Sequence, residues 1–213
     1  MVHTHIKALV FDLDGTLYVS GGLGREINNV ACRYIAELKG IDVTAAELLI
    51  REAREALTAA AGTDATLSKA CVELGGDLPE LHRRFAVEIA PEQHIVRDNR
   101  VIELLRMLAG GFELYLYTNN NRLLSRRIMD IIGVTGIFQR VFTIEDRWVP
   151  KPDRQALEQI LHEIGRTPEE CLFVGDRFDV DLRLPAELGC SVCLVQNVEE
   201  LFPLCKLLHE ENL

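Results

Sequence analysis

Basic residues are scarce in this sequence relative to acidic ones. It contains 23 Lys and Arg residues against 33 Asp and Glu, which gives a formal net charge of −10. An acidic surface repels phosphate backbones and anionic lipid headgroups, so we expect neither a nucleic acid polymer nor a membrane as a partner. A small phosphorylated metabolite is still compatible, because one cation-lined pocket can coexist with an acidic exterior.

An export signal and long apolar runs are also missing. Residues Met1–Lys7 contain no basic region followed by an apolar stretch, and no run approaches the length that spans a bilayer. The six cysteines lie inside apolar patterns, not at the regular loop spacings of a disulfide framework. We therefore expect reduced thiols and a cytoplasmic location.

The chain alternates between apolar runs and amphipathic stretches. Hydrophobic residues make up 48% of it, which excludes disorder. The strand-like runs are residues 6–12, 112–117, 141–143, 171–174 and 191–195. The helix-like stretches between most of them are residues 101–108, 123–132, 154–164 and 182–188. This alternation predicts an α/β fold, a doubly wound parallel sheet with helices on both faces.

One long interval interrupts the alternation. About a hundred residues separate the first two strands, where a parallel crossover needs about a dozen. The interval has helical patterns: an apolar stripe at Ile27–Leu38, a capping box at Thr44–Glu47 with a helix ending near Gly62, and segments 66–74 and 79–89. We expect a helical cap at residues 18–96, inserted into an α/β core of residues 1–17 and 97–213. The glycine-rich residues 20–24 are expected to be a flexible hinge.

Polar side chains follow four of the predicted strands at the point where each strand ends. The clusters are Asp12–Thr16, Thr118–Asn119, Lys151–Pro152 and Gly175–Asp181. The carboxyl ends of parallel strands lie along one edge of an open α/β sheet, where ligands bind. We therefore expect these acids, hydroxyl and cation to converge in one site.

The order and content of these clusters resemble the motifs of the haloacid dehalogenase-like (HAD) hydrolases, along essentially the whole chain. The first motif of that family, Asp-x-Asp-Gly-Thr-Leu, is complete at residues 12–17. The second and third, a Thr or Ser after an apolar strand and a Lys often followed by Pro, match Thr118 and Lys151. The fourth, Gly-Asp with another acid a few residues on, matches Asp176 and Asp181, although Asp179 is also a candidate for the second acid.

The resemblance implies a phosphatase that forms an aspartyl-phosphate on Asp12 and then hydrolyses it. A carboxylate nucleophile divides a very slow reaction into two easier steps, provided that the charge of the phosphate is neutralised. Mg²⁺ suits this task because it is a hard cation that prefers oxygen ligands. The ligands that the resemblance implies are Asp12, Asp176 and the backbone carbonyl of Asp14.

Three further residues are expected to act on the phosphate, and one to support the site. The Thr118 hydroxyl can donate to a phosphoryl oxygen and Lys151 supplies positive charge, so both are counted with the catalytic residues. Asn119 is expected to bind phosphate beside them. Asp181 is expected to be a supporting acid.

Asp14 is expected to be the general acid and base. It lies two residues after Asp12, so both side chains share one face of an extended chain. From there it can protonate the departing alkoxide and later deprotonate the attacking water. The family's dehalogenases lack this second acid, because a halide needs no proton, and its presence therefore argues against dehalogenation. Gly15 permits the following turn, and Thr16 is expected to orient Asp14.

Two other classes of function compete with a phosphatase. A phospho-acceptor similar to response-regulator receivers would also use Asp, Thr, Lys and a metal-binding acid pair, but such domains are shorter and their acid pair precedes the phosphorylated Asp. A non-catalytic binding protein would usually have lost the equivalent of Asp12 or Asp14, and both are present.

Two substrate classes are compatible with the sequence. The first motif continued by Tyr18, a short glycine-rich stretch and a helical cap is similar to pyrimidine 5′-nucleotidase-like members of the family. This similarity favours a nucleoside 5′-monophosphate. The same features overlap with phosphoglycolate-phosphatase-like members, so phosphoglycolate or a sugar phosphate is the alternative.

Overall fold

A five-stranded parallel sheet forms the centre of the molecule. The structure is a computed structural model, and it describes residues 6–204 and 208. The strands are β1 (Ala8–Phe11), β2 (Glu113–Tyr117), β3 (Arg140–Phe142), β4 (Cys171–Gly175) and β5 (Ser191–Leu194). Their order is β3-β2-β1-β4-β5, and all neighbours pair in parallel. The chain therefore winds outward from β1 in both directions, which confirms the predicted doubly wound sheet.

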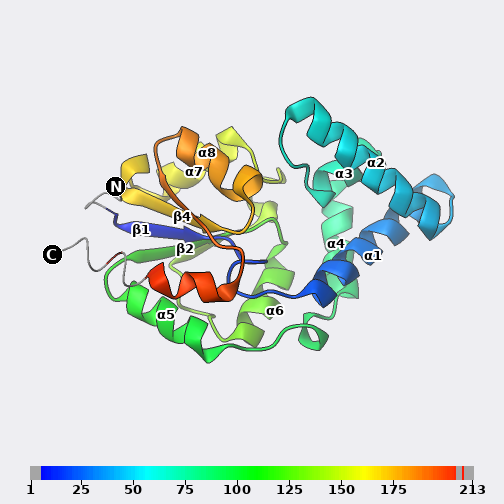
Figure 1. Ribbon diagram of the computed structural model, residues 1–213. Coiled ribbons are helices and arrows are strands. Elements are labelled where there is room, and N and C mark those ends of the chain that lie inside the picture. The colour runs from blue at the N-terminus through cyan, green and yellow to red at the C-terminus, as the bar shows by residue number, and fades with distance from the viewer. Residues whose placement is uncertain (1–5, 205–207, 209–213) are drawn as a thin grey trace.

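Helices cover both faces of this sheet (Figure 1). α5 (Asn99–Ala109) and α6 (Arg122–Ile132) lie on one face, and α7 (Arg154–Ile164) and α8 (Arg183–Glu187) lie on the other. Alternate residues of β1 supply the two apolar layers: Leu9 and Phe11 pack toward α5 and α6, and Ala8 and Val10 toward α7. Burial on both sides explains why this strand is apolar at every position and does not alternate with polar residues.

Four helices make up the interval between β1 and β2. They are α1 (Gly21–Lys39), α2 (Val43–Ala61), α3 (Leu67–Glu73) and α4 (Leu78–Glu88), and they pack on one another beyond the carboxyl ends of the strands (Figure 1). The predicted stripe of α1 is buried at Val30 and Ile35, whereas Leu38, in its last turn, is exposed. The buried residues of these helices are continuous with the apolar layer on the α5 and α6 face.

Two local expectations for this interval were wrong. Asp42, not Thr44, caps α2: its Oδ1 accepts from the backbone N–H of Ala45 at 2.9 Å, so the helix starts before the predicted capping box. The predicted end near Gly62 is confirmed, with Gly62 in the left-handed conformation. Residues 20–24 form no hinge loop, because α1 begins at Gly21 and Ser20 is its N-cap.

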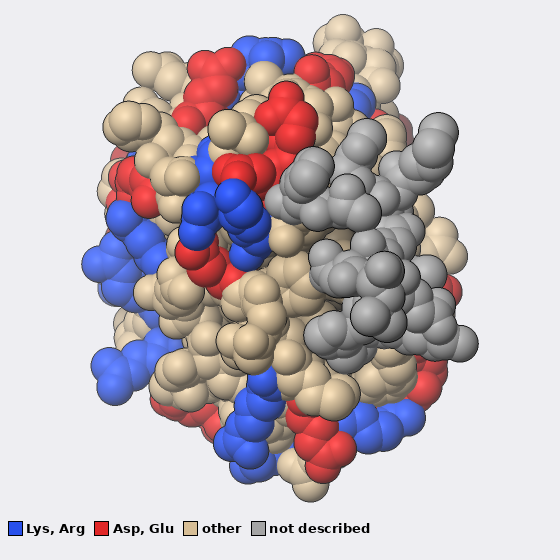
Figure 2. All heavy atoms as spheres, turned by 90° about the vertical axis from the view of Figure 1, so that its left-hand side faces the viewer, with Lys and Arg blue, Asp and Glu red and all other residues tan. Residues whose placement is uncertain are grey.

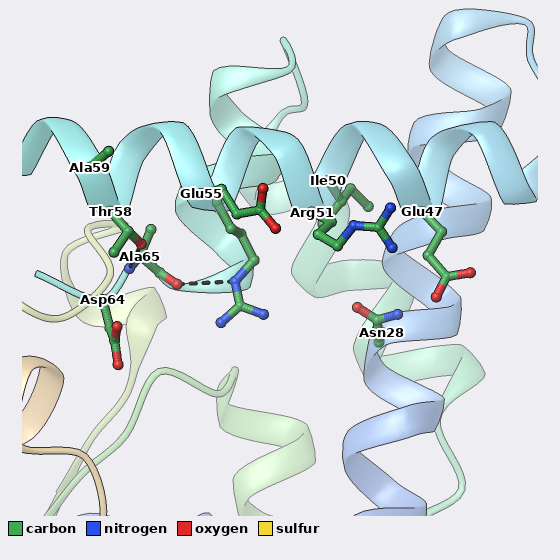
Figure 3. Close-up of a pocket in the computed structure, with 10 residues that line it drawn as sticks. Asn28, Glu47, Ile50, Arg51, Glu55, Thr58, Ala59, Asp64 and Ala65 are labelled. Atoms are coloured by element: carbon green, nitrogen blue, oxygen red, sulfur yellow. Dashed lines mark hydrogen bonds between the residues drawn. The ribbon is translucent and has the colours of Figure 1, made fainter.

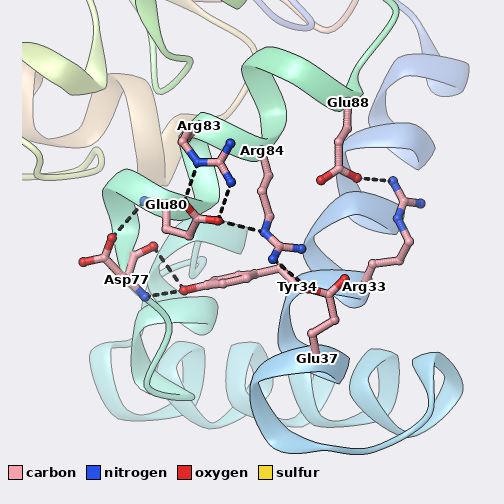
Figure 4. A network of polar contacts seen from close by, with 8 residues as sticks. All are labelled: Arg33, Tyr34, Glu37, Asp77, Glu80, Arg83, Arg84 and Glu88. Carbon is pink, nitrogen blue, oxygen red and sulfur yellow. Dashed lines mark hydrogen bonds and ion pairs between the residues drawn. The ribbon is translucent and has the colours of Figure 1, made fainter.

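A polar network joins α1 to α4 (Figure 4). The Tyr34 hydroxyl accepts from the backbone N–H of Asp77 at 2.7 Å. Arg84 lies over the Tyr34 ring and pairs with Glu37 on α1 and with Glu80 on α4. Exposed ion pairs contribute only about 0–1 kcal/mol each, so this network chiefly fixes how the two helices are oriented.

The face at the other end of the molecule, near the amino ends of the strands, carries mixed charge. Figure 2 shows acidic and basic side chains interspersed there among uncharged residues. Two ion pairs between residues far apart in the sequence form at those strand ends, Lys7 with Glu170 and Arg166 with Glu113. Among the residues that the structure describes, no helix is both long enough and apolar enough to cross a membrane.

Candidate active site

The structure brings the four predicted clusters together at the carboxyl edge of the sheet. Asp12 follows β1, Thr118 follows β2, Lys151 lies in the loop after β3, and Asp176 and Asp181 follow β4. Because β1 and β4 are neighbours in the sheet, the backbone N–H of Asp12 bonds the carbonyl of Val174 at 2.8 Å, and the acids of the two strands meet. The acids meet between β1 and β4, where the order of the strands reverses. Ligands of open α/β sheets usually bind at the carboxyl ends of the strands at such a point.

Lys151 is the buried cation of this site, with 2% of its surface exposed. Its Nζ donates to Asp12 Oδ1 and Asp181 Oδ1, both at 2.6 Å, and to the carbonyl of Tyr117 at 2.9 Å. Burial alone would lower the pKa of the Lys151 ammonium, but the two carboxylates outweigh it and hold that pKa above its ordinary value. Lys151 is therefore charged and fully hydrogen-bonded at neutral pH.

Asp12 has one bonded and one free carboxylate oxygen. Oδ1 accepts from Lys151, whereas the buried Oδ2 has no hydrogen-bond partner. Burial raises the pKa of Asp12 to about 7, and the attraction of Lys151 opposes that rise. The free oxygen lies inside the site, so it is available to a ligand.

Three carboxylates converge tightly enough to hold a metal ion. Asp12, Asp176 and Asp181 each offer one oxygen, and these atoms lie within 4.8 Å of one another. Asp176 Oδ1, like Asp12 Oδ2, is buried without a hydrogen-bond partner, and a hard cation would satisfy both. Asp181 is already occupied on both oxygens, by Lys151 and by the backbone N–H of Arg177 at 3.1 Å. The donor set fits Mg²⁺, with Asp12 and Asp176 as the free ligands.

The choice between Asp179 and Asp181 follows from the same geometry. Asp181 is buried among the acids and the lysine, whereas Asp179 is partly exposed and its Oδ1 lies 3.8 Å from Arg183 Nε on the outside of the site. The chain from Phe178 to Leu182 forms one wide π-helical turn that carries the two acids in different directions. Asp181 is the acid that joins the site.

Two glycines allow the acids to approach the backbone so closely. Gly15 has φ of +87°, in the left-handed region, and a Cβ atom there would overlap the Asp176 carboxylate. A Cβ atom on Gly175 would lie 2.5 Å from Asp181 Cβ. The turn after β1 and the end of β4 therefore require residues without side chains.

Asp14 is held by two side chains that the sequence did not single out for this purpose. Asn120 Nδ2 donates to Asp14 Oδ2 at 2.6 Å, and the Tyr18 hydroxyl donates to Asp14 Oδ1. Burial raises the pKa of Asp14, and the bond from Tyr18 opposes that rise. The expectation that Thr16 orients Asp14 was wrong, because the buried Thr16 hydroxyl has no hydrogen-bond partner.

Hydrogen bonds to the side chains of Thr118 and Asn119 fix the loops around these carboxylates. The fully buried Thr118 Oγ1 accepts from the backbone N–H of Asn120 at 3.1 Å, which leaves its own hydrogen free to donate. Asn119 Oδ1 accepts from the backbone N–H of Lys151 at 2.8 Å and so fixes the lysine loop against the end of β2. The short sequence after β2 thus contacts both Asp14 and Lys151.

A cavity of about 410 Å³ opens between this edge and the inserted helices. Asp14, Asn119, Asp176 and Arg177 form its wall on the sheet side. The opposite wall comes from the helical interval and includes Leu23, Ile27, Ser68, His82 and Phe85. Its volume lies in the range of small-molecule sites, about 300–1,000 Å³.

A larger cavity, about 570 Å³, lies elsewhere (Figure 3). All of its lining residues fall between Asn28 and Ala65, on α1, on α2 and in the segment that follows α2. Its charged groups have both signs, such as Glu47 and Arg51. Size therefore does not identify the active site here. The smaller cavity is the one that contains Asp14 and Asp176.

Comparison with known proteins agrees with this geometry. A family model described as haloacid dehalogenase-like hydrolase matches residues 6–189. The chain is 27% identical over 199 residues to a glyceraldehyde 3-phosphate phosphatase of Methanopyrus kandleri, covering 84% of this chain and 78% of that protein. It is 27% identical over 204 residues to a phosphoglycolate phosphatase of Salmonella paratyphi A, covering 87% and 79%.

A solved structure shares the fold. The magnesium-bound candidate HAD hydrolase YfnB from Bacillus subtilis superposes with a TM-score of 0.58 at 18% identity, covering 95% of this chain and 99% of that one. The family match extends over most of the chain, and its four motifs meet at one sheet edge. This chain therefore belongs to the haloacid dehalogenase-like hydrolases and is an enzyme of their phosphatase type.

Proposed function

We propose that this enzyme hydrolyses small phosphate monoesters by transferring the phosphoryl group to Asp12 and then to water. The observation that carries the proposal is the state of the Asp12 carboxylate, which is fixed by Lys151 on Oδ1 and free on the buried Oδ2. If Mg²⁺ takes the free Oδ2, the oxygen that remains to attack phosphorus in line with the departing ester oxygen is Oδ1, which Lys151 holds in a fixed direction.

Charge neutralisation is what allows an anionic nucleophile to approach an anionic ester. Two unit charges about 4 Å apart interact by about 4 kcal/mol at an effective dielectric near 20. Lys151 supplies one full positive charge beside Asp12, and the Thr118 hydroxyl can donate to a phosphoryl oxygen. Mg²⁺ held by Asp12, Asp176 and the Asp14 carbonyl would supply the rest. The magnesium-bound state of the structurally similar YfnB supports this choice of ion.

Asp14 is the proposed proton donor and acceptor. In the first step its proton passes to the ester oxygen as the P–O bond breaks, which releases an alcohol and leaves the Asp14 carboxylate. In the second step that carboxylate takes a proton from the water that attacks the phosphorus, which restores Asp12 and releases phosphate. The burial that raises the pKa of Asp14 favours the protonated form that the first step needs.

The helical interval acts as a cap in this proposal. Residues 18–96 supply one wall of the 410 Å³ cavity, and the core of residues 1–17 and 97–213 supplies the other. The phosphate would lie against the core wall, beside Asn119 and Lys151, and the rest of the substrate would contact the helices.

A phosphorylated two- or three-carbon metabolite is the substrate class that the comparisons support best. The relatives described above are named for glyceraldehyde 3-phosphate and phosphoglycolate. These names favour the alternative of phosphoglycolate or a sugar phosphate over a nucleoside 5′-monophosphate. Phosphatase relatives over most of the chain also speak against a non-catalytic binding protein or a phospho-acceptor.

The test is phosphate release by the purified enzyme from p-nitrophenyl phosphate, glycerol 3-phosphate, phosphoglycolate and nucleoside monophosphates, with and without Mg²⁺. We expect magnesium-dependent turnover that Asp12→Asn abolishes. Asp179→Asn is the matched control, because it removes a nearby acid that lies outside the site. Turnover in Asp12→Asn close to wild type would place the nucleophile elsewhere.

The metal assignment has its own test. Asp176→Asn should raise the Mg²⁺ concentration for half-maximal activity by about tenfold or more, whereas Asp179→Asn should leave it unchanged. Superimposable magnesium titrations of Asp176→Asn and wild type would show that Asp176 is not a ligand.

A further inference from the structure

His82 is a buried polar residue that the proposed chemistry does not use. It lies on α4 in the cap wall of the 410 Å³ cavity, with 2% of its surface exposed. Its ring makes edge contacts with Phe85, at 5.2 Å between centroids, and with Trp148, at 6.3 Å. Asn121 Nδ2 donates to the His82 carbonyl at 3.0 Å and holds this part of α4 against the core.

The two nitrogens of the His82 ring differ in their surroundings. Nε2 lies 3.3 Å from the hydroxyl of Ser68, another buried residue of the same cavity wall. Nδ1 is buried and has no hydrogen-bond partner. Buried polar atoms are nearly always paired, and an unpaired one at a cavity wall is explained if the ligand of that cavity supplies the partner.

The charge of His82 limits what that partner can be. Burial lowers the pKa of the imidazole to about 4, so the ring is neutral at neutral pH. A neutral imidazole pairs well with a hydroxyl or carbonyl group, but it gives no positive charge to a carboxylate that has lost its water. Arg177 also lines this cavity, but on the core wall opposite His82. Its Nε lies 3.9 Å from Asp176 Oδ1, beside the proposed phosphate site.

We propose that His82 and Ser68 bind the end of the substrate remote from the phosphate and select an uncharged hydroxyl or carbonyl group over a carboxylate. The inference rests on the proposed phosphatase function and deepens it. It assigns the enzyme to phosphate esters of small polyols or sugars, and it disfavours phosphorylated carboxylic acids.

Two substrates with matched carbon chains test the selectivity. Glycerol 3-phosphate and 3-phosphoglycerate differ at the far end, where one carries a hydroxymethyl group and the other a carboxylate. We expect the wild-type enzyme to have at least a tenfold higher kcat/KM for glycerol 3-phosphate. A preference for 3-phosphoglycerate, or no preference, would overturn the proposal.

Two His82 variants separate the roles of the ring nitrogens. An Asn side chain places its amide near the Nδ1 position, and a Gln side chain reaches the Nε2 position. We expect His82→Gln to lower kcat/KM for glycerol 3-phosphate by threefold to tenfold, the range of one hydrogen bond, while His82→Asn retains more of it. In both variants the ratio of kcat/KM for glycerol 3-phosphate to kcat/KM for p-nitrophenyl phosphate should fall, and it should fall further in His82→Gln, because the aryl group offers no hydroxyl to that wall.

Ser68→Ala provides a variant that only loses a hydroxyl, in case the His82 variants fold poorly. It should reduce the preference for glycerol 3-phosphate, whereas Thr135→Ala, which removes an exposed hydroxyl of the core, should not. An unchanged preference in His82→Gln and Ser68→Ala, with normal thermal unfolding, would show that the pair only packs the cap. Failure of the wild-type enzyme to hydrolyse p-nitrophenyl phosphate would instead refute the phosphatase proposal on which the inference rests.

Discussion

Asn120 donates a hydrogen bond of 2.6 Å to Asp14, across 106 positions of sequence. The bond joins the loop after β2 to the turn after β1, and with Tyr18 it occupies both carboxylate oxygens of Asp14. A general acid must present its proton in a fixed direction, so these two residues are expected to position Asp14.

Asn120→Ala should impair protonation of the leaving group more than any other step. We expect the single-turnover rate of enzyme phosphorylation to fall by about tenfold or more for alkyl phosphates, because general acid catalysis commonly supplies about 10²–10⁴ in rate. Aryl phosphates leave as stabilised phenolates and should be less affected. The measurement is the dependence of that rate on leaving-group pKa, which should be steeper in the variant. Parallel slopes for Asn120→Ala and wild type would exclude a positioning role.

Lys151→Met should destabilise the fold as well as abolish activity. It leaves Asp12 and Asp181 buried without their cation, and breaking a buried pair costs about 3–5 kcal/mol of unfolding free energy. Adding Asp181→Asn should restore at least about 1 kcal/mol, because one uncompensated carboxylate is then gone. Urea unfolding of the single and double variants measures both values.

Arg100→Met is the control for that cycle, since it removes ion pairs with Asp98 and Glu199 that lie at the surface. Its loss of stability should be much smaller than that of Lys151→Met, because water screens exposed pairs. An equal loss of stability in Lys151→Met and Arg100→Met would contradict the structural importance of the buried cation.

Gly15→Ala should displace Asp176, the proposed metal ligand, without removing it. The added methyl group meets the Asp176 carboxylate, and the left-handed backbone at Gly15 adds strain of about 1–3 kcal/mol. We expect lower thermal stability and a higher Mg²⁺ requirement. Gly111→Ala is the control, because a Cβ atom there has no neighbour within 4 Å. Normal magnesium dependence in Gly15→Ala would show that Asp176 tolerates the displacement.

His82 should make stability depend on pH in the mildly acidic range. Its pKa is about 4 in the folded protein and has its ordinary value of 6.5 in the unfolded chain. Between these values the unfolded chain binds a proton that the folded protein does not. The unfolding free energy therefore falls as the pH is lowered from 6.5 to 4, by up to about 3 kcal/mol in total.

The comparison with His82→Gln isolates this effect, because both proteins keep the same acidic residues. The difference in unfolding free energy, wild type minus variant, should decrease as the pH falls through that range and then level off below pH 4. Parallel pH profiles for the two proteins, measured by urea unfolding, would show that His82 does not remain neutral in the folded state.

The sequence alone determined the architecture and the main members of the site. All five strands lie within two residues of their predicted ends. The signal was clearest in β1 and β4, which are buried at every position and carry no charged residue. The helical insertion was visible from its length and periodicity. Asp12, Asp14, Thr118, Lys151 and Asp176 could be named because each directly follows a strand or lies in a short, ordered motif.

Only the tertiary structure decided which of these groups contact one another. Asp181 was distinguished from Asp179 by a wide π-helical turn, whose geometry is not revealed by two acids separated by one residue. The bond from Asn120 to Asp14 and the contact of His82 with Ser68 join separate elements, and no local pattern encodes such pairs. Local sequence sets which side chains reach the sheet edge, whereas the packing of α1–α4 beside that edge sets which polar atoms are left without a partner.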